Sequence, residues 1–284
     1  MVIKCHAKIN LALQVKGTRE DGYHLLSMVN LPIDLHDVIE IESLPYYKDT
    51  YIVCDELRLL NGHSNICMKV IDHMRAKCGF QENFLVRIHK GIPSAAGLGG
   101  GSSDAANVMM AVNHMLKLGL STRDLCELSL PVGSDIPFFL HGKPALVEGI
   151  GNIVTPITVK KTYHVLVIKP EKGLSTKDVY KVCNETERLL IDTSKVVDGL
   201  VEGDDGKIIA NFGNDLFPAA KKLLPEVADI VAELRKDGFP LSAMTGSGSC
   251  CYALSCDTKA LKSEEKKWIK KGYDTYLTKL LQGE

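Results

Sequence analysis

The chain has 284 residues, of which 45% are apolar and 24% charged. These are ordinary globular values, and they exclude a collagen-like, disordered or coiled-coil chain. The 34 Lys and Arg residues balance 35 Asp and Glu residues, so no overall field gathers nucleic acid or anionic lipid. No apolar run reaches the ~18 residues of a membrane span. We predict a soluble, cytoplasmic protein that binds neither nucleic acid nor membrane, and its oligomeric state stays open.

The nine cysteines contain no C-x-x-C pair and no spacing typical of a zinc site. We therefore expect reduced thiols that behave mostly as small apolar residues.

The first half of the chain mixes strands with helices. Its first forty residues have the alternation of strands, with a turn at Asp21-Gly22. The glycines at 79 and 119 are typical helix ends, and Ser64 is a candidate cap. The pattern predicts a helix over 64–79, a strand over 84–90, a helix over 105–118 and a short helix over 122–130.

The second half changes in pattern near 150–160, which we take as a candidate domain boundary. Residues 194–211 look like a polar excursion. The other segments predict a strand over 163–170, a helix capped by Ser175, a helix over 225–238, two strands around a Gly/Ser loop in 241–255, and a closing strand and helix with a basic face. Strands and helices do not alternate regularly, which favours an α+β fold.

The segment GIPSAAGLGGGSSDAA, residues 91–106, is the most informative one. Five glycines fall between 91 and 101, directly before a strong helix. Glycine lets the backbone approach a ligand closely, and a helix start adds N–H donors and a positive dipole end. The pattern indicates a phosphate cradle, although it is neither a Walker A loop nor G-x-G-x-x-G. The alternative is a flexible loop before a capped helix.

Five residues elsewhere are candidates whose roles the sequence alone leaves open. Asp135 follows Gly-Ser and could be an ordinary turn or helix cap. Lys8 lies in an apolar strand, where it either points to solvent or needs a buried anionic partner, and Asn10 would share its face. Tyr23 and His24 follow the turn as a half-buried aromatic residue and a surface imidazole.

Several motifs together resemble those of the GHMP small-molecule kinases. The glycine segment resembles their ATP-binding motif, AKINLAL (7–13) their first motif, and MTGSGSCCYAL (244–254) their third. Within that superfamily the chain is most similar to the 4-diphosphocytidyl-2-C-methyl-D-erythritol kinases. That similarity includes DGYH-x-L (21–26), VGSDIPFFL-x-G-x-P-A-L-x-E-G-x-G (132–151) and N-D-L-F-P (214–218).

The resemblance implies an α+β, two-domain fold: a ribosomal-S5-like domain over 1–155 that binds ATP, and a ferredoxin-like domain over 156–284. It implies ATP-dependent phosphorylation of the 2-hydroxyl of a small-molecule substrate carrying a cytidine diphosphate group. ATP is then a co-substrate, and Mg²⁺ is expected with it, although the sequence offers no clear ligand set beyond Ser102 or Ser103.

The resemblance also assigns residues to roles. Lys8 and Asp135 are the expected catalytic pair, with Asp135 as base or orienting group for the acceptor hydroxyl. The expected substrate-binding residues are Asn10, Tyr23, His24, Asp135 and Tyr180. The expected ATP-binding residues are Asn65, Lys90, Pro93, Ser94, Ala95, Ala96, Gly97, Leu98, Gly99, Gly100, Gly101, Ser102 and Ser103.

Two alternatives stay open. One is another GHMP kinase, acting on homoserine, mevalonate or a sugar alcohol; DGYH and SDIPFF argue against it. The other is a non-catalytic nucleotide-binding homologue. The joint presence of Lys8, Asp135 and the glycine segment disfavours that one.

Overall fold

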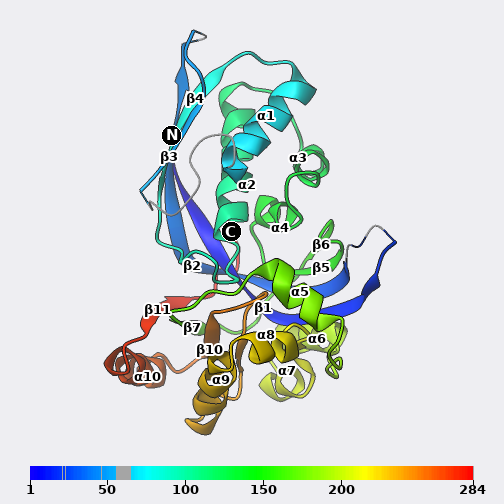
Figure 1. Ribbon diagram of the computed structural model, residues 1–284, viewed down its shortest axis with the longest axis vertical. Helices are drawn as coiled ribbons and strands as arrows, with labels where there is room; N and C mark the ends of the chain where they lie inside the picture. The colour runs from blue at the N-terminus through cyan, green and yellow to red at the C-terminus, as the bar shows by residue number, and fades with distance from the viewer. Residues whose placement is uncertain (21, 23, 46, 56–64, 284) are drawn as a thin grey trace. The chain divides into compact units, whose positions relative to one another are not determined.

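The computed structural model describes residues 1–284 except 21, 23, 46, 56–64 and 284. The chain divides into two compact units, each made of several segments. Unit 1 comprises Met1–Ala7, His36–Ile92 and Gly99–Gly142, and unit 2 comprises Lys8–Leu35, Pro93–Leu98 and Lys143–Glu284. Two long strands, β1 (Val2–Thr18) and β2 (His24–Leu44), contribute residues to both units (Figure 1).

Unit 1 contains a sheet built on the second half of β2. Strand β4 (Asn83–His89) pairs antiparallel with residues 38–44 of β2 and parallel with β3 (Tyr51–Cys54). Along β4, buried residues alternate with more exposed ones, as expected of a strand with one face in the core. The strand predicted over 84–90 is confirmed within one residue.

The helices of unit 1 pack against one another: α1 (Ile66–Cys78), α2 (Gly100–Met115), α3 (Thr122–Ser129) and α4 (Ile136–His141). Helix α1 ends at Gly79 as predicted, with φ 74°. The expected cap Ser64 lies outside the described residues. Helix α2 begins five residues before its predicted start, because glycine and serine are tolerated in a first turn whose N–H groups need no partner within the helix.

Unit 2 contains the first half of β2 and part of β1. Strand β5 (Ala145–Gly149) pairs antiparallel with residues 26–30 of β2, and β6 (Ile153–Pro156) pairs with β5. The short strand β8 (Gly213–Asn214) pairs in parallel with Ala12 and Leu13 of β1.

A second, antiparallel sheet of unit 2 has the order β11-β7-β10-β9. Its strands are β7 (His164–Lys169), β9 (Ser242–Met244), β10 (Cys251–Ser255) and β11 (Asp274–Lys279). Helices α9 (Glu226–Lys236) and α10 (Thr258–Lys270) pack on it (Figure 1). Apart from the segment between β7 and α9, which holds four further helices and the short strand β8, the chain order is β7, α9, β9, β10, α10, β11. This is the split βαβ arrangement of a ferredoxin-like fold, which confirms the expected α+β class.

The prediction of a polar excursion over 194–211 is wrong. The segment forms α6 (Thr193–Glu202) and α7 (Asp205–Asn211). Asp192 and Asp204 accept N–H hydrogen bonds at the two helix starts, and Val196, Leu200 and Ile208 are buried. The capping aspartates and surface lysines make the segment polar on average, so its apolar face is not evident from composition. The remaining helices are α5 (Thr176–Cys183), which is capped by Ser175 as predicted, and α8 (Phe217–Leu223).

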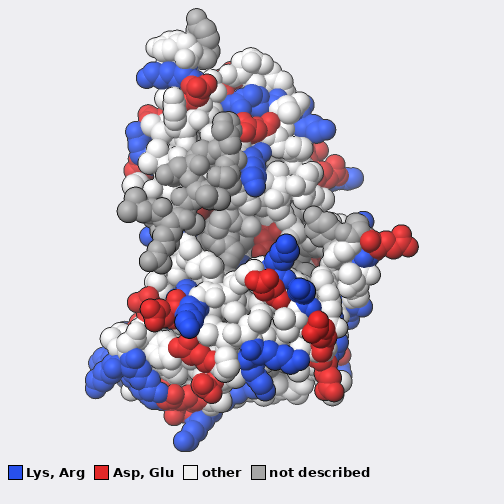
Figure 2. Space-filling view, viewed as in Figure 1, with Lys and Arg blue, Asp and Glu red and all other residues white. Residues whose placement is uncertain are grey.

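All nine cysteines are free, as predicted, and most are buried. On the face drawn in Figure 2, Lys and Arg are interspersed with Asp and Glu over much of the surface. Within the described residues, no helix is both long enough and apolar enough to cross a bilayer.

Candidate active site

Strand β1 is bonded to the glycine segment within unit 2. The Lys8 amide donates to the Leu98 carbonyl at 3.0 Å. The Lys8 ammonium, on a residue only 4% exposed, donates to Asn10 Oδ1 at 2.5 Å. Asn10 Nδ2 in turn donates to Asn30 Oδ1 at 2.6 Å. Lys8 and Asn10 therefore share a face, as their spacing predicts, and Lys8 points inward rather than to solvent.

The Gly/Ser turn after β9 contacts both β1 and the glycine segment. Thr245 Oγ1 accepts the Asn10 amide at 3.1 Å and donates to the Gly97 carbonyl at 3.3 Å. A Cβ on Gly97 would lie 2.2 Å from the Thr245 carbonyl oxygen, and one on Gly246 would lie 2.8 Å from the Gly97 oxygen. Both positions also have positive φ. Only glycine permits this approach, so the three sequence motifs meet in unit 2.

Asn214 and Asp215, in the N-D-L-F-P motif, hold the two elements that meet here, the Thr245 turn and β1. We call this meeting point of β1, the glycine segment and the Thr245 turn the junction. Asn214 Nδ2 donates to the carbonyls of Met244 and Gly246 at 3.0 and 2.8 Å. The carboxylate of Asp215, which is fully buried, accepts the amides of Val15 and Leu189, both at 2.8 Å. The sequence analysis quoted the motif without giving these residues a role. The sequence feature that could have indicated their role is a pair of polar residues directly before an apolar helix start.

The start of α2 lies in unit 1 and leaves its first amides without a side-chain cap. Gly99 occupies the N-cap with φ 74°, and no side chain caps the helix. The first intrahelical bond runs from the Ser103 amide to the Gly99 carbonyl at 2.9 Å. The amides before it therefore have no helical partner and can donate to phosphate, assisted by the helix dipole.

Of the two candidate Mg²⁺ ligands, Ser102 is half-buried, while the Ser103 hydroxyl is buried and has no hydrogen-bond partner among the described residues. The Ser102 hydroxyl therefore fits a magnesium-phosphate group better, because a metal could reach it. A divalent ion there would supply charge neutralisation at the phosphates.

The earlier part of the glycine segment, in unit 2, is bent at Ala95. This residue has φ 52°, a left-handed value that is unusual for alanine. Its Cβ lies against Gly173, where an added Cβ would be 3.1 Å away. Pro93 and Ser94 before it are half-buried.

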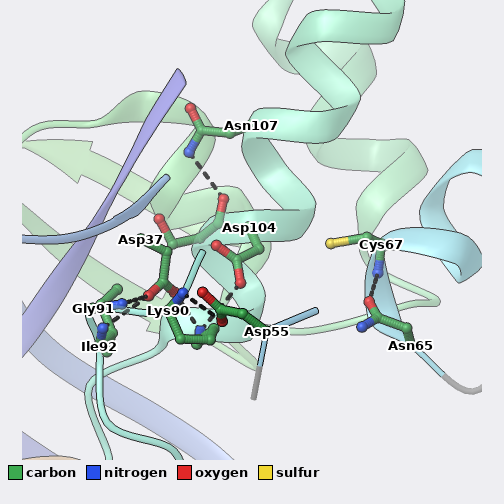
Figure 3. A network of polar contacts seen from close by, with 10 residues as sticks. Asp37, Asp55, Asn65, Cys67, Lys90, Gly91, Ile92, Asp104 and Asn107 are labelled. Atoms are coloured by element: carbon green, nitrogen blue, oxygen red, sulfur yellow. Dashed lines mark hydrogen bonds and ion pairs between the residues drawn. The ribbon is translucent and has the colours of Figure 1, made fainter. Parts of the chain in front are cut away.

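A buried ionic network lies at the entry of the glycine segment in unit 1. Asp37 of β2 is fully buried; its Oδ1 accepts the amides of Gly91 and Ile92 at 2.7 and 2.8 Å, and its Oδ2 binds the Lys90 ammonium. Figure 3 shows the Lys90 side chain between Asp37 and Asp104, and its Nζ lies 3.3 Å from Asp104 Oδ2. In the sequence, Asp37 looks like one more polar residue of a strand, so nothing there predicts its part in this network.

The network shifts the pKa values of Lys90 and Asp104. Burial works to lower the pKa of Lys90, but the carboxylates of Asp104 and Asp37 outweigh it and raise that pKa. Burial raises the pKa of Asp104 to about 8, against the lowering effect of Lys90. The neighbouring carboxyl groups thus favour the charged form of Lys90, whereas burial favours the neutral form of Asp104.

Two other predicted residues of unit 1 are at helix starts. Asn65 Oδ1 caps α1 by accepting the Cys67 amide at 2.8 Å (Figure 3). Asp135 occupies the N-cap position of α4, but its half-buried side chain makes no capping hydrogen bond. The ordinary cap interpretation therefore does not account for its carboxylate. Asp135 and Lys8 belong to different units, and their pairing stays a prediction.

The expected base-binding residues of unit 2 are brought together in part. The rings of His24 and Tyr180 have centroids 4.8 Å apart and planes tilted by 38°. His24 Nε2 lies 2.9 Å from Asn184 Oδ1, at the end of α5. Tyr23 lies outside the described residues. Two of the expected residues, His24 and Tyr180, thus lie side by side although they are 156 positions apart in sequence.

Comparison with known families places these features in one class of protein. The model of the GHMP kinase N-terminal domain matches residues 65–143, and that of the GHMP kinase C-terminal domain matches 197–274. The first match covers the glycine segment and Asp135, and the second covers the Thr245 turn. The class of protein is that of the ATP-dependent GHMP small-molecule kinases.

Individual relatives narrow the class. The chain is 37% identical to a 4-diphosphocytidyl-2-C-methyl-D-erythritol kinase of Thermoanaerobacter pseudethanolicus, over 92% of this chain and 89% of the relative. It is 36% identical to the Clostridium botulinum kinase of the same name, over 90% and 91%. The chain belongs to this family of kinases.

Solved structures agree in fold. A crystal structure of 4-(cytidine 5'-diphospho)-2C-methyl-D-erythritol kinase matches with a TM-score of 0.81 and 26% identity over the whole of both chains. A homoserine kinase from Cytophaga hutchinsonii matches with a TM-score of 0.76 at 19% identity, over 99% of this chain and 95% of that one. The second likeness concerns the fold alone.

Proposed function

We propose that the protein transfers the γ-phosphoryl group of ATP to the 2-hydroxyl of 4-diphosphocytidyl-2-C-methyl-D-erythritol, giving ADP and the 2-phosphate. The observation that carries this proposal is the identity of 36–37% over about nine-tenths of the chain with kinases named for this substrate. The reaction belongs to the non-mevalonate route of isoprenoid biosynthesis. A cytoplasmic location and action without a nucleic-acid or membrane partner belong to the same proposal.

Binding of ATP is assigned to the glycine segment. The open amides at the start of α2 would receive the phosphates, with Ser102 as the expected Mg²⁺ ligand. Backbone donors suit a protein whose net charge is -1, because a local array of N–H groups needs no basic surface. We also keep Asn65 and the rest of the segment from Pro93 to Ser103 as nucleotide-binding residues, within a domain over 1–155 followed by one over 156–284.

Transfer of the phosphoryl group is assigned to Lys8 and Asp135. Phosphoryl transfer depends mostly on positioning and on neutralising charge. Asp135 would accept or orient the proton of the acceptor hydroxyl, which leaves as the oxygen bonds to phosphorus and ADP departs. Lys8, held inward by Asn10, would keep that carboxylate ionised and offset the phosphate charge.

Recognition of the cytosine base is assigned to Tyr23, His24 and Tyr180. Planar rings can stack on the base, and an imidazole nitrogen can bond its polar edge. The contact of the His24 and Tyr180 rings within unit 2 supports this assignment.

A coupled assay of ADP release by the purified protein tests the proposal. We expect turnover with 4-diphosphocytidyl-2-C-methyl-D-erythritol and none with homoserine, mevalonate or a sugar alcohol. Turnover with one of those alcohols alone would make the protein another GHMP kinase. Nucleotide binding in a titration without any turnover would make it a non-catalytic homologue.

The substitution Asp135→Asn tests the chemistry at one residue. We expect kcat to fall about 10²–10⁴-fold, the usual contribution of general acid-base groups, with little change in thermal stability. Glu127→Gln is the matched control, because Glu127 is an exposed carboxylate of the neighbouring helix α3. Near-normal turnover of the Asp135→Asn variant would remove Asp135 from its catalytic role.

A further inference from the structure

Asp37 accepts three hydrogen bonds from one short stretch of chain. Its Oδ1 takes the amides of Gly91 and Ile92, and its Oδ2 takes the ammonium of Lys90. The side chain is fully buried. A carboxylate that binds two consecutive amides fixes the backbone direction at that point, since both N–H vectors must converge on one oxygen.

The Lys90 ammonium connects this entry to the other side of the glycine segment. It bonds Asp37 on β2 and Asp104 on α2, five positions after the N-cap of that helix. A Cβ on Gly100 would lie 3.3 Å from Lys90 Nζ and 3.1 Å from Ile92 Cγ2. The first helical residue thus rests directly against the residues that Asp37 holds.

Gly91 makes the entry equally tight. A Cβ there would lie 2.3 Å from the His36 carbonyl oxygen, so the segment begins in direct backbone contact with β2. A residue larger than glycine at position 91 would therefore push the segment away from β2.

This geometry changes the interpretation of Lys90. The resemblance assigns Lys90 to ATP binding, but its ammonium lies between the side chains of Asp37 and Asp104, and its side chain is only 10% exposed. A buried ion pair of this kind adds little stability compared with apolar residues of the same size, so its use here is geometric.

We propose that Asp37 and Lys90 are positioning residues for the nucleotide, which hold the entry of the glycine segment against the first turns of α2 and so preset the amides that receive phosphate. This inference rests on the proposed function, because it presumes that the segment binds ATP. The pair acts through the backbone and touches neither substrate.

The substitution Asp37→Asn tests this, because it keeps the shape and removes the charge. With a non-hydrolysable ATP analogue and Mg²⁺ in a calorimetric titration, we expect binding at least tenfold weaker than in the unsubstituted protein. KM for ATP rises by a similar factor, because a hydrogen bond to a charged group contributes tenfold or more to an equilibrium constant. We expect kcat at saturating ATP and KM for the alcohol to stay within about threefold. Glu42→Gln, an exposed carboxylate on the same strand, is the matched control and leaves binding unchanged.

Asp104→Asn is expected to have a smaller effect than Asp37→Asn. Asp104 has a 3.3 Å contact to Lys90, and its Oδ1 has no hydrogen-bond partner among the described residues. Equal losses in the two variants would contradict the leading role of Asp37.

A second design covers the case in which the Asp37→Asn variant does not fold. The double variant Asp37→Asn/Lys90→Met removes the ammonium together with its main partner, and burial then keeps Asp104 protonated. Because no unpaired charge is left in the interior, we expect it to fold and to bind the analogue at least tenfold more weakly. In the nucleotide-free unsubstituted protein, the amides of Gly91 and Ile92 must exchange slowly with deuterium. Rapid exchange there, or unweakened binding in a folded variant, overturns the inference. If the unsubstituted protein binds no nucleotide at all, the proposed function fails instead.

Discussion

The same glycine segment is held in two physically different ways. In unit 2, residues 96–98 are held by backbone hydrogen bonds and by close approach to the Thr245 turn, without a single charge-charge contact among these bonds. In unit 1, the flanks of the segment are held by a buried ionic network around Lys90. The first depends on the absence of side chains and the second on their charge, so the two regions should respond differently to substitution and pH.

We expect the largest effect from a substitution in the uncharged region, where Gly97 contacts the Thr245 turn. Gly97→Ala places a Cβ 2.2 Å from the Thr245 carbonyl, whereas Gly79→Ala, at nearly the same φ, meets nothing within 4 Å. We expect Gly79→Ala to cost about 1–2 kcal/mol, the strain of a left-handed alanine. Gly97→Ala should cost roughly twice that or more and abolish measurable nucleotide binding, because the two loops must separate.

Urea denaturation and titration with an ATP analogue measure both quantities. Equal losses in the two alanine variants would mean that backbone conformation alone, and not loop contact, makes Gly97 necessary.

A middle-sized effect is expected at Asn214, which supports the same junction. Its substitution by alanine leaves the carbonyls of Met244 and Gly246 and the Leu216 amide without their partner. We expect a loss of roughly 2–4 kcal/mol in the free energy of unfolding, together with weaker nucleotide binding.

Asn113→Ala is the matched control, because Asn113 makes a comparable pair of bonds to Leu120 in unit 1, away from the glycine segment. It should lower stability without changing nucleotide affinity. If both variants bind equally well, the support from Asn214 is purely structural.

The smallest effect concerns the charged side and appears as a pH dependence. Burial raises the pKa of Asp104 from 3.8 to about 8, so between these values the native state keeps a proton that the unfolded chain releases. The stabilising contribution is complete at low pH and is lost as pH rises toward 8. Asp104→Asn removes this pH dependence, so the free energy of unfolding of the variant should rise relative to that of the unsubstituted protein as pH increases from 5 to 8. Denaturation curves at several pH values that stay parallel would contradict this.

The sequence predicted one of these two regions and missed the other for a physical reason. Glycines are necessary wherever backbones touch, so Gly97 and Gly246 leave a visible pattern in the chain. Asp37 lies in a strand with other acidic residues, and only the pairing of β2 with β4 brings it to Lys90. Helices α6 and α7 are hard to predict for a different reason. Their capping aspartates make the segment polar on average, although three of its apolar residues are buried.

The bonds between Asn10 and Thr245 have a consequence for how the protein is made. They join residues 235 positions apart, and the Asp215 carboxylate joins its partner Val15 across 200 positions. During synthesis from the N-terminus, Asn10 and Val15 of β1 cannot form these bonds until most of the chain has been made. Such long-range contacts slow folding and leave strand edges exposed in the meantime. The contacts of β1 with the Thr245 turn are therefore among the last parts of the protein to form, although the residues of β1 are among the earliest to be synthesised.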